Sequence, residues 1–285
     1  MKTEINHTKS RSGITLVLGG TGKTGRRVAE RLADRGVQTR VASRSANPSF
    51  DWNDQGSWGA VLDGVEAAYI SYAPDLAIPG ATESVRDFIE MAVEQGVQRF
   101  VLLSGRGEEE AQRCERIVQD AGVEWTVVRA SWFNQNFSEG EFLGMVLDGE
   151  ITLPAGDIPE PFVDIDDIAD VAVAVLTEDG HDGEIYEVTG PRMLTFTEVA
   201  KEISRAAGRV VQFIQIPKEA FAGAIAESGA PDDIAWLLNY LFETVLDGRN
   251  AYVCDGVQRA LGREPTDFSD YARRIAASGV WKVAA

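Results

Sequence analysis

The feature that most constrains this chain is a glycine-rich stretch at residues 14–25, which reads ITLVLGGTGKTG. Branched apolar residues over Ile14–Leu18 indicate a buried strand, and helical periodicity follows over Arg26–Arg35. A strand, a tight glycine turn and a helix open the dinucleotide-binding fold, because the first amides of such a helix point at phosphate groups. We therefore expect phosphates to bind at the turn made by Gly19, Gly20, Thr21, Gly22, Lys23, Thr24 and Gly25.

Two alternatives to this interpretation concern the same turn. A P-loop would need a further glycine at the position of Val17, so the Gly22-Lys23-Thr24 step does not indicate one. The other alternative is a turn between a strand and a helix that binds no ligand. The apolar run before the glycines and the helical pattern after them favour dinucleotide binding.

Composition narrows the class of protein further. The 285 residues, of which 44% are apolar, suffice for one large α/β domain or a core domain with a small lobe. A net charge of −18 disfavours nucleic acid and anionic membrane surfaces as partners. Cys114 and Cys254 lack metal-site spacing, and His7 and His181 are isolated, so we expect no metal site. Residues 1–12 are polar and read as a flexible tail without a signal peptide, which favours a cytoplasmic protein.

Strand and helix patterns alternate through the first half of the chain. Parallel strands joined by helices follow from such alternation, so we predict a doubly wound, Rossmann-type α/β core over residues 13–190. The predicted strands lie at 37–44, 67–72, 99–104 and 125–129, with a short one ending near Asp51, and the predicted helices at 57–62, 82–95 and 108–121.

The alternation breaks after Ala130. An aromatic and asparagine-rich segment at 131–137 comes first, and residues 131–160 are expected to contribute to a substrate crevice. Thr195 and Glu198 form a capping box that opens a helix, and residues 191–285 are expected to form a small, mainly helical carboxy-terminal lobe. The predicted helices here lie at 141–147, 166–176, 199–207, 221–226, 233–246 and 268–277, and the strands at 151–153, 161–163 and 184–188.

The segment after the second strand indicates which dinucleotide binds. A site for NAD places an acidic residue about 20 residues past the glycines, to hold the ribose hydroxyls. This chain reads ASRSAN at residues 42–47, without an acid. Arg44 and Ser43 can hold a 2′-phosphate instead, so we predict that NADP(H) is preferred over NAD(H). The alternative is an ordinary surface arginine at a strand end.

Other candidate site residues follow from their places at strand ends. Asp51 can accept a hydrogen bond from an adenine amino group, or it can cap the turn that follows. Ligands in open α/β sheets sit at the carboxyl ends of the strands, so Tyr72, Ser104 and the loop at 132–137 should face one crevice. The aromatic residues of that loop can stack on a flat substrate or fill a seam between lobes. Its asparagines, Asn134 and Asn136, also suit turns.

Two groups of acidic residues are interpreted as helix beginnings. Asp164, Asp166 and Asp167 precede or open an apolar helix, where the helix dipole favours acids over metal binding. Glu108–Glu110 is interpreted as a solvated first helical turn.

These stretches together resemble the NmrA-like branch of the atypical short-chain dehydrogenases/reductases. Within that branch the chain looks most like the clavine-type dehydrogenases of ergot alkaloid pathways and related NAD(P)H-dependent reductases. The resemblance covers about residues 14–275. The motifs that carry it are LGGTGKTG (18–25), ASRS (42–45), FDW (50–52), RFVLLS (99–104), ASWFNQNF (130–137), PFVDIDDIADVA (161–172) and YEVTGPRMLTFTEVA (186–200).

The resemblance implies roles for particular residues. The nucleotide would lie on the glycine turn, with Arg44 near the 2′-phosphate and Asp51 and Trp52 beside the adenine. Ser104 would lie near the nicotinamide and is the candidate catalytic residue. The loop Tyr72, Ala73 and Pro74 would also lie near the nicotinamide, and Trp132, Phe133, Asn136 and Phe137 would line the substrate pocket.

One departure from the family's pattern limits the chemistry. Short-chain dehydrogenases normally carry a Tyr-x-x-x-Lys pair that exchanges a proton with the substrate. Residues 105–122, after Ser104, contain neither tyrosine nor lysine. One expectation is therefore NADPH-dependent hydride transfer to a planar, electron-poor small molecule, such as an iminium, a quinone or a dye. The alternative is a non-catalytic sensor of NADP(H) whose final lobe, ending in Trp281, presents a partner surface. Monomer and homodimer both stay open.

Overall fold

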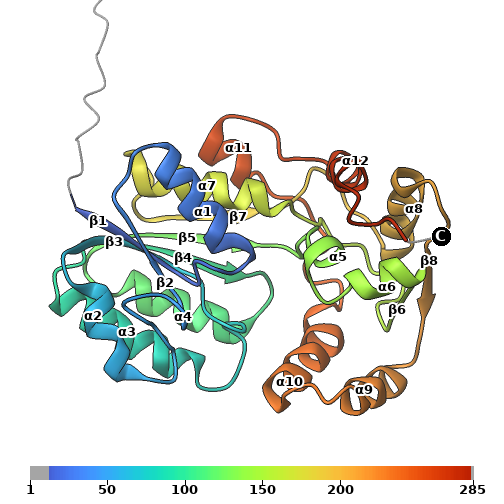
Figure 1. Cartoon of the computed structure of the whole chain (residues 1–285), viewed down its shortest axis with the longest axis horizontal. Helices are drawn as coiled ribbons and strands as arrows, with labels where there is room; N and C mark the ends of the chain where they lie inside the picture. The colour runs from blue at the N-terminus through green and yellow to red at the C-terminus, as the bar shows by residue number, and fades with distance from the viewer. Residues whose placement is uncertain (1–12, 284–285) are drawn as a thin grey trace, which may run out of the picture.

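One parallel sheet forms the frame of the larger part of the molecule. The computed structural model describes residues 13–283, so the tail expected at 1–12 lies outside the described residues. Six parallel strands pair in the order β2-β1-β3-β4-β5-β7, which confirms the doubly wound α/β, Rossmann-type fold (Figure 1). The strands are β1 (Ile14–Leu18), β2 (Thr39–Ala42), β3 (Val65–Ile70), β4 (Arg99–Gly105), β5 (Glu124–Ala130) and β7 (Glu184–Val188).

Helices cover both faces of the sheet, because its strands are apolar on both faces. Successive residues of a strand point to opposite faces, so Leu16 and Leu18 pack under one helical layer and Val17 under the other. The first layer holds α2 (Trp58–Leu62), which the short turn η1 (Gln55–Ser57) precedes, α3 (Ala81–Glu94) and α4 (Glu109–Gln119). The second layer holds α1 (Lys23–Asp34), α7 (Ile165–Thr177) and α11 (Gly256–Leu261).

The strand order sets where a ligand can bind. β1 lies between β2 and β3, so the winding of the chain reverses at β1. Open α/β sheets leave a crevice at such a reversal, outside the carboxyl ends of the strands. The loops that follow β1, β2 and β3 all start at this edge.

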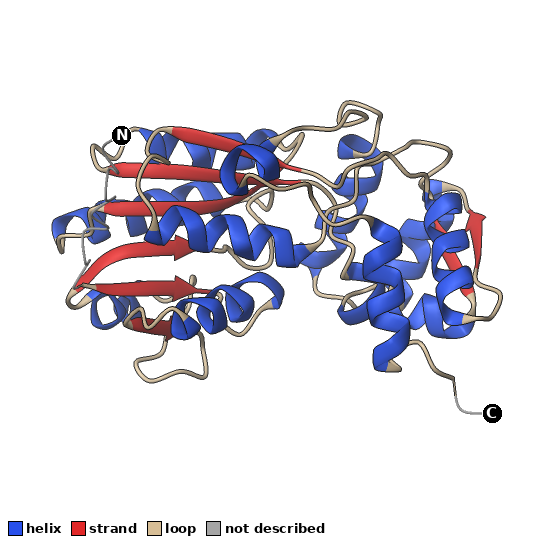
Figure 2. Cartoon of the chain, turned by 90° about the horizontal axis from the view of Figure 1, so that it is seen from above, coloured by secondary structure: helices blue, strands red, loops and turns tan. Residues whose placement is uncertain are grey.

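A smaller lobe stands beyond the carboxyl ends of the strands, and the arrowheads of the sheet point toward it (Figure 2). Its core is aromatic, with Phe137, Phe142, Phe196, Phe242 and Phe268 in one buried cluster. Residues 137–162 and residues from 194 onward share this cluster, whereas α11 returns to the sheet. The lobe holds the parallel pair β6 (Glu150–Leu153) and β8 (Gln212–Gln215), and the helices α5 (Asn136–Glu139), α6 (Leu143–Asp148), α8 (Phe196–Ala207), α9 (Lys218–Glu227), α10 (Asp232–Tyr240), the π-helical turn η2 (Leu241–Val245) and α12 (Phe268–Ser278). Within residues 13–283, no helix combines the length and the apolar character needed to cross a bilayer.

The prediction of a strand that ends near Asp51 is wrong. Asp51 makes one isolated antiparallel bridge, to Asp54. The backbone groups of Asp51 form hydrogen bonds with side chains instead. The Ser57 hydroxyl accepts from the Asp51 amide at 3.0 Å, and Trp58 Nε1 donates to the Asp51 carbonyl at 2.8 Å. A strand at this position would need those same groups for a ladder.

Several predicted boundaries also shift. The strand predicted at 161–163 is absent from the described structure, where Val163 makes a single parallel bridge to Phe133. The helix predicted at 26–35 begins earlier, at Lys23, and the helix predicted at 141–147 corresponds to α6, which begins at Leu143 and ends at Asp148. The short helix α5 before it was not predicted. The helix predicted at 233–246 changes to a π-helical turn at Leu241. β8 and α11 were not predicted.

Candidate functional site

A cavity of about 990 Å3 lies at the carboxyl ends of β1–β5, between the sheet and the smaller lobe. Its volume is at the upper end of the range for small-molecule sites, about 300–1,000 Å3. Segments from five strand ends and from the smaller lobe line it. The predicted site residues in its lining are Gly19, Thr21, Gly22, Lys23, Thr24, Ser43, Arg44, Asp51, Trp52, Tyr72, Ala73, Pro74, Ser104, Trp132, Phe133 and Asn136.

The glycine turn closes one end of this cavity. Gly19 adopts a left-handed φ of 64°, which favours glycine. A Cβ at Gly25 would lie 2.3 Å from the carbonyl oxygen of Gly19, so only glycine lets α1 pack this closely on the turn. Gly25 and Gly20 shape the turn from behind and are not among the residues lining the cavity within the described chain.

The amino terminus of α1 is open to an anion. Gly22 caps this helix, and within residues 13–283 no side chain accepts a hydrogen bond at the cap. The first turn of α1 carries no acidic residue either. The contrast is α7, where the Asp164 carboxylate caps the helix by accepting from the Asp166 amide at 3.0 Å. Uncapped amides with the positive end of a helix dipole fit a phosphate group.

Arg44 and Ser43 lie side by side at the end of β2, where they line the cavity. Arg44 is exposed, and among the described residues its guanidinium has no ion-pair partner. The Ser43 hydroxyl lies 3.3 Å from that of Ser45. Asp51 also lines the cavity, but one of its oxygens accepts from the Asn53 amide at 3.0 Å. Asp51 therefore caps its turn with this oxygen.

Ser104 lies in the cavity wall but its proton is already engaged. The residue is 4% exposed, and its Oγ donates to Oε1 of Glu115 at 2.6 Å. Glu115 is also held by Arg129, whose Nε lies 2.9 Å from the same oxygen. Ser104 can accept a hydrogen bond from a ligand, whereas proton donation by Ser104 is not supported by this geometry.

The loop after β5 divides between the cavity and the core of the lobe. Trp132, Phe133 and Asn136 line the cavity, and Asn136 Oδ1 accepts from Lys23 Nζ at 3.1 Å. Phe137 is fully buried among aromatic residues of the lobe and does not line the cavity, so its predicted place in the substrate pocket is wrong. Asn134 is likewise buried, as part of the loop rather than the pocket.

Several residues of the lining were not predicted, above all Asp75, Arg106 and Glu108. Glu108 was interpreted as part of a solvated helical turn, and this is wrong. It is 6% exposed and precedes α4 as its cap residue, while Glu109 and Glu110 form the first turn. Pro231, Ile234, Leu241 and Asn250 close the cavity from the smaller lobe. The sequence indicated only that these four residues belong to that lobe, and not that they line the cavity.

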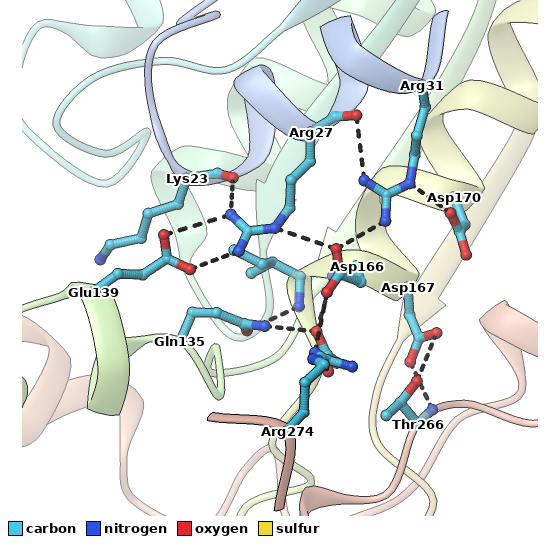
Figure 3. A network of polar contacts seen from close by, with 12 residues as sticks. Lys23, Arg27, Arg31, Gln135, Glu139, Asp166, Asp167, Asp170, Thr266 and Arg274 are labelled. Atoms are coloured by element: carbon cyan, nitrogen blue, oxygen red, sulfur yellow. Dashed lines mark hydrogen bonds and ion pairs between the residues drawn. The ribbon is translucent and has the colours of Figure 1, made fainter. Parts of the chain in front are cut away.

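The acidic residues at the start of α7 bind arginines. Figure 3 shows Asp166 between Arg27 and Arg31, with Nε of Arg27 at 3.2 Å and Nη2 of Arg31 at 2.8 Å. Arg27 also reaches Glu139 of α5 at 2.7 Å, and Arg274 of α12 binds Asp164 at 2.6 Å. These contacts join the helix of the glycine turn to the smaller lobe. Among residues 13–283, no group of three or more ligating side chains could hold a metal ion.

Comparison with known proteins decides the family. The model of the NmrA-like family matches residues 11–272. The chain belongs to the NmrA-like family. This NmrA-like protein is 32% identical to agroclavine dehydrogenase of Claviceps fusiformis over 274 residues, which cover 90% of this chain and 95% of that one. The resemblance to clavine-type dehydrogenases is thereby confirmed, and relatives of this NmrA-like protein are oxidoreductases.

Two solved structures share the fold of this NmrA-like protein. An NADPH-dependent quinone oxidoreductase of Escherichia coli in complex with NADPH matches with a TM-score of 0.78 and 22% identity, covering 92% of this chain and 99% of that one. NmrA, a negative transcriptional regulator in complex with NAD, matches with a TM-score of 0.68 and 17% identity, covering 93% and 96%. At these identities the two matches concern the fold.

Proposed function

We propose that this protein is an NADPH-dependent oxidoreductase that reduces a planar, electron-poor small molecule. The observation that carries the proposal is the uncapped amino terminus of α1, which opens into the same cavity as the aromatic loop at Trp132. One end of the cavity thus fits a phosphate, and the other fits a flat apolar molecule.

The residues present fit NADP(H). The amides of Thr21, Lys23 and Thr24, which line the cavity, would hold the pyrophosphate, and Arg44 with Ser43 would hold the 2′-phosphate. Asp51 accepts from the adenine amino group with the oxygen that its own turn leaves free. When bound, the reduced nicotinamide supplies a hydride. The chain's own contribution is to place the acceptor in the cavity and to exclude water around it.

The lining of the cavity supports the choice of acceptor. Trp132 is half-buried against Phe242, with ring centroids 5.2 Å apart, so its ring is fixed at the cavity wall. Tyr72 is fixed likewise by Trp52, at 4.6 Å. Fixed aromatic faces stack on planar molecules at little cost in side-chain entropy. Because residues 105–122 hold no Tyr-x-x-x-Lys pair, an acceptor that takes hydride readily is favoured over a simple ketone.

The experiment follows NADPH absorbance with a quinone, an iminium compound and a cationic triarylmethane dye as acceptors. We expect turnover with at least one of these classes. Trp132→Leu should raise KM for that acceptor, whereas Trp236→Leu, which alters an exposed tryptophan of α10, should leave KM unchanged. Absence of turnover with every class at saturating NADPH would contradict the proposal.

A non-catalytic NADP(H) sensor is the second candidate, and the fold shared with the regulator NmrA favours it. Such a sensor must bind NADPH and NADP+ with different conformational consequences, because a ligand shifts an equilibrium only through differential affinity. Limited proteolysis with each nucleotide tests this. Different cleavage patterns without any turnover would favour the sensor, and identical patterns with turnover would remove it. A cytoplasmic location is part of either proposal.

A further inference from the structure

Two carboxyl groups meet in the cavity from neighbouring strand ends. Asp75 lies in the loop after β3 and Glu108 in the loop after β4, and both line the cavity. The Glu108 side chain folds back over the end of β4, so that a Cβ at Gly105 would lie 2.3 Å from Oε1. This close approach holds the carboxyl of Glu108 at the cavity wall.

The hydrogen-bond partners of the two carboxyl groups differ. Asp75 Oδ1 accepts from the Ala77 amide at 2.8 Å. Oε2 of Glu108 is buried, and no donor of the described residues reaches it. The neighbouring cation does not help, because the Arg106 guanidinium points to Glu187 and to the Asn250 carbonyl. A buried carboxylate oxygen without a donor is costly, so the carboxyl of Glu108 is favoured in its neutral, protonated form.

The charges around Glu108 act in the same direction. Burial raises the pKa of Glu108 well above its usual range, and the negative charges of Asp75 and Glu115 raise it further. Burial raises the pKa of Asp75 as well, but the Ala77 amide and a hydrogen bond from Glu108 favour its ionised form. Tyr240 of α10 also faces Glu108, and burial raises the pKa of the Tyr240 phenol. A proton in this pair is therefore favoured on Glu108 over Asp75.

Other acids of the lining are poorer proton donors. Asp51 caps its own turn, and Asp233 on α10 is exposed and accepts from the Ile234 amide at 2.9 Å. The Ser104 hydroxyl already donates its hydrogen bond to Glu115. Among the acids that line the described cavity, Glu108 is the one whose burial and missing hydrogen-bond donor most favour the protonated form.

We propose that Glu108 is a catalytic residue that donates a proton to the oxygen of an acceptor reduced in this cavity, with Asp75 as its positioning residue. This inference rests on the proposed oxidoreductase function. Reduction of a quinone to a hydroquinone takes up one hydride, as NADPH is oxidised to NADP+, and two oxygens of the product must carry protons. The hydride accounts for two electrons and one hydrogen. The O–H bond of Glu108 breaks, a new O–H bond forms on the acceptor, and water returns a proton to the Glu108 carboxylate.

The proposal distinguishes acceptors by their chemistry. A cationic triarylmethane dye or an iminium ion is neutralised by hydride alone and takes no proton. Loss of the Glu108 proton should therefore slow quinone reduction much more than reduction of a cationic dye. A general acid contributes about 10²- to 10⁴-fold to a rate.

The experiment compares Glu108→Gln and Asp75→Asn with Glu109→Gln, a matched change at the exposed neighbouring position. The first readout is the infrared band of a protonated carboxyl at neutral pH, in the protein without nucleotide. We expect the difference between the infrared spectra of the wild type and of Glu108→Gln to show this band. We expect Asp75→Asn to lose it as well, because an amide in place of Asp75 can donate to ionised Glu108. Glu109→Gln should keep the band.

The second readout is turnover with two acceptors. We expect Glu108→Gln to lower the ratio of quinone turnover to cationic-dye turnover at least tenfold, whereas Glu109→Gln should keep the wild-type ratio. Unchanged quinone turnover in Glu108→Gln, or no carboxyl band from Glu108, would overturn the donor role of Glu108. The proposed oxidoreductase function would still stand in that case if the wild type reduces the dye. Failure of the wild type with both acceptors would instead contradict the proposed function, and the donor role with it.

Discussion

The indole Nε1 of Trp281 donates a hydrogen bond to the backbone carbonyl of Phe137 at 2.8 Å, across 144 positions of sequence. Trp281 is 2% exposed and packs against Tyr271, with ring centroids 6.0 Å apart. The carboxy-terminal segment is thus tied to the loop that leads from the cavity into the smaller lobe. The side chain of Trp281 fills the core of the lobe, so a partner surface on this lobe, which stays a prediction, would be formed by other residues.

Removal of that tryptophan should destabilise the protein strongly. We expect Trp281→Ala to lower the free energy of unfolding by about 3–5 kcal/mol, because a large buried ring leaves a cavity and the Phe137 carbonyl loses its donor. Trp236→Ala, at an exposed position, should cost less than about 1 kcal/mol. Urea denaturation of both variants checks this, and equal effects would contradict it.

The cofactor preference is tested at Arg44. Arg44→Ala should weaken NADPH binding by about 1.5–3 kcal/mol, the range for hydrogen bonds to charged groups, and leave NADH binding unchanged. Arg44→Glu should reverse the preference. Fluorescence titration with both nucleotides measures this, and Arg113→Ala, an exposed arginine of α4, is the control. Wild-type protein that binds NADH as tightly as NADPH would refute the predicted preference.

The glycine turn offers a second test of nucleotide binding. In Gly25→Ala the new Cβ would collide with the Gly19 carbonyl, which must then move, so we expect at least a tenfold loss of affinity for NADPH. Gly223→Ala in α9 meets open space and should raise stability slightly without affecting the nucleotide. Calorimetric titration of the two variants decides the point. Nearly equal affinities would mean that the nucleotide does not use this turn.

Glu160 should make stability depend on pH. Burial raises its pKa to about 7, although the positive charge of Arg106 and the Ser131 hydroxyl lower it and Asp247 raises it. The folded-state pKa exceeds the unfolded value of about 4.3, so the folded state binds more protons between these values. The free energy of unfolding therefore falls as pH rises through this window, by about 3 kcal/mol for this group.

Glu160→Gln removes that dependence. We expect the variant to gain stability relative to wild type as pH rises from about 5 to about 8, with the difference levelling off above the folded-state pKa. Denaturant unfolding at several pH values measures the difference. A gap between variant and wild type that stays constant with pH would show that Glu160 is ionised throughout.

The parts of this fold that local pattern specifies could be predicted from sequence. The run Ile14–Leu18 and the glycines after it determine a strand, a turn and a helix within one short segment, and the structure has all of them. The capping box of Thr195 and Glu198 was likewise found, with both of its hydrogen bonds present. In each case neighbouring residues supply both partners of the interaction.

Features that depend on distant residues could not be predicted in this way. Glu108 stands before two further glutamates, and such a run looks the same whether solvated or folded back over Gly105. β8 pairs with β6, which lies far away in the chain. The short segment of β8 has no alternation of apolar and polar residues that would indicate a strand. Whether Trp132 or Phe137 faces the cavity depends on how the smaller lobe closes over the loop, which no local spacing indicates.

The central claim is hydride transfer to a planar acceptor, and an isotope label tests it most directly. We would incubate the protein with NADPH carrying deuterium at C4 and a cationic triarylmethane dye, and analyse the colourless product by mass spectrometry. The account predicts that deuterium from the transferred position lies on the central carbon of the product, one per molecule, because hydrogen on that carbon does not exchange with water. A product without the label, or no product at all with saturating nucleotide, would contradict it.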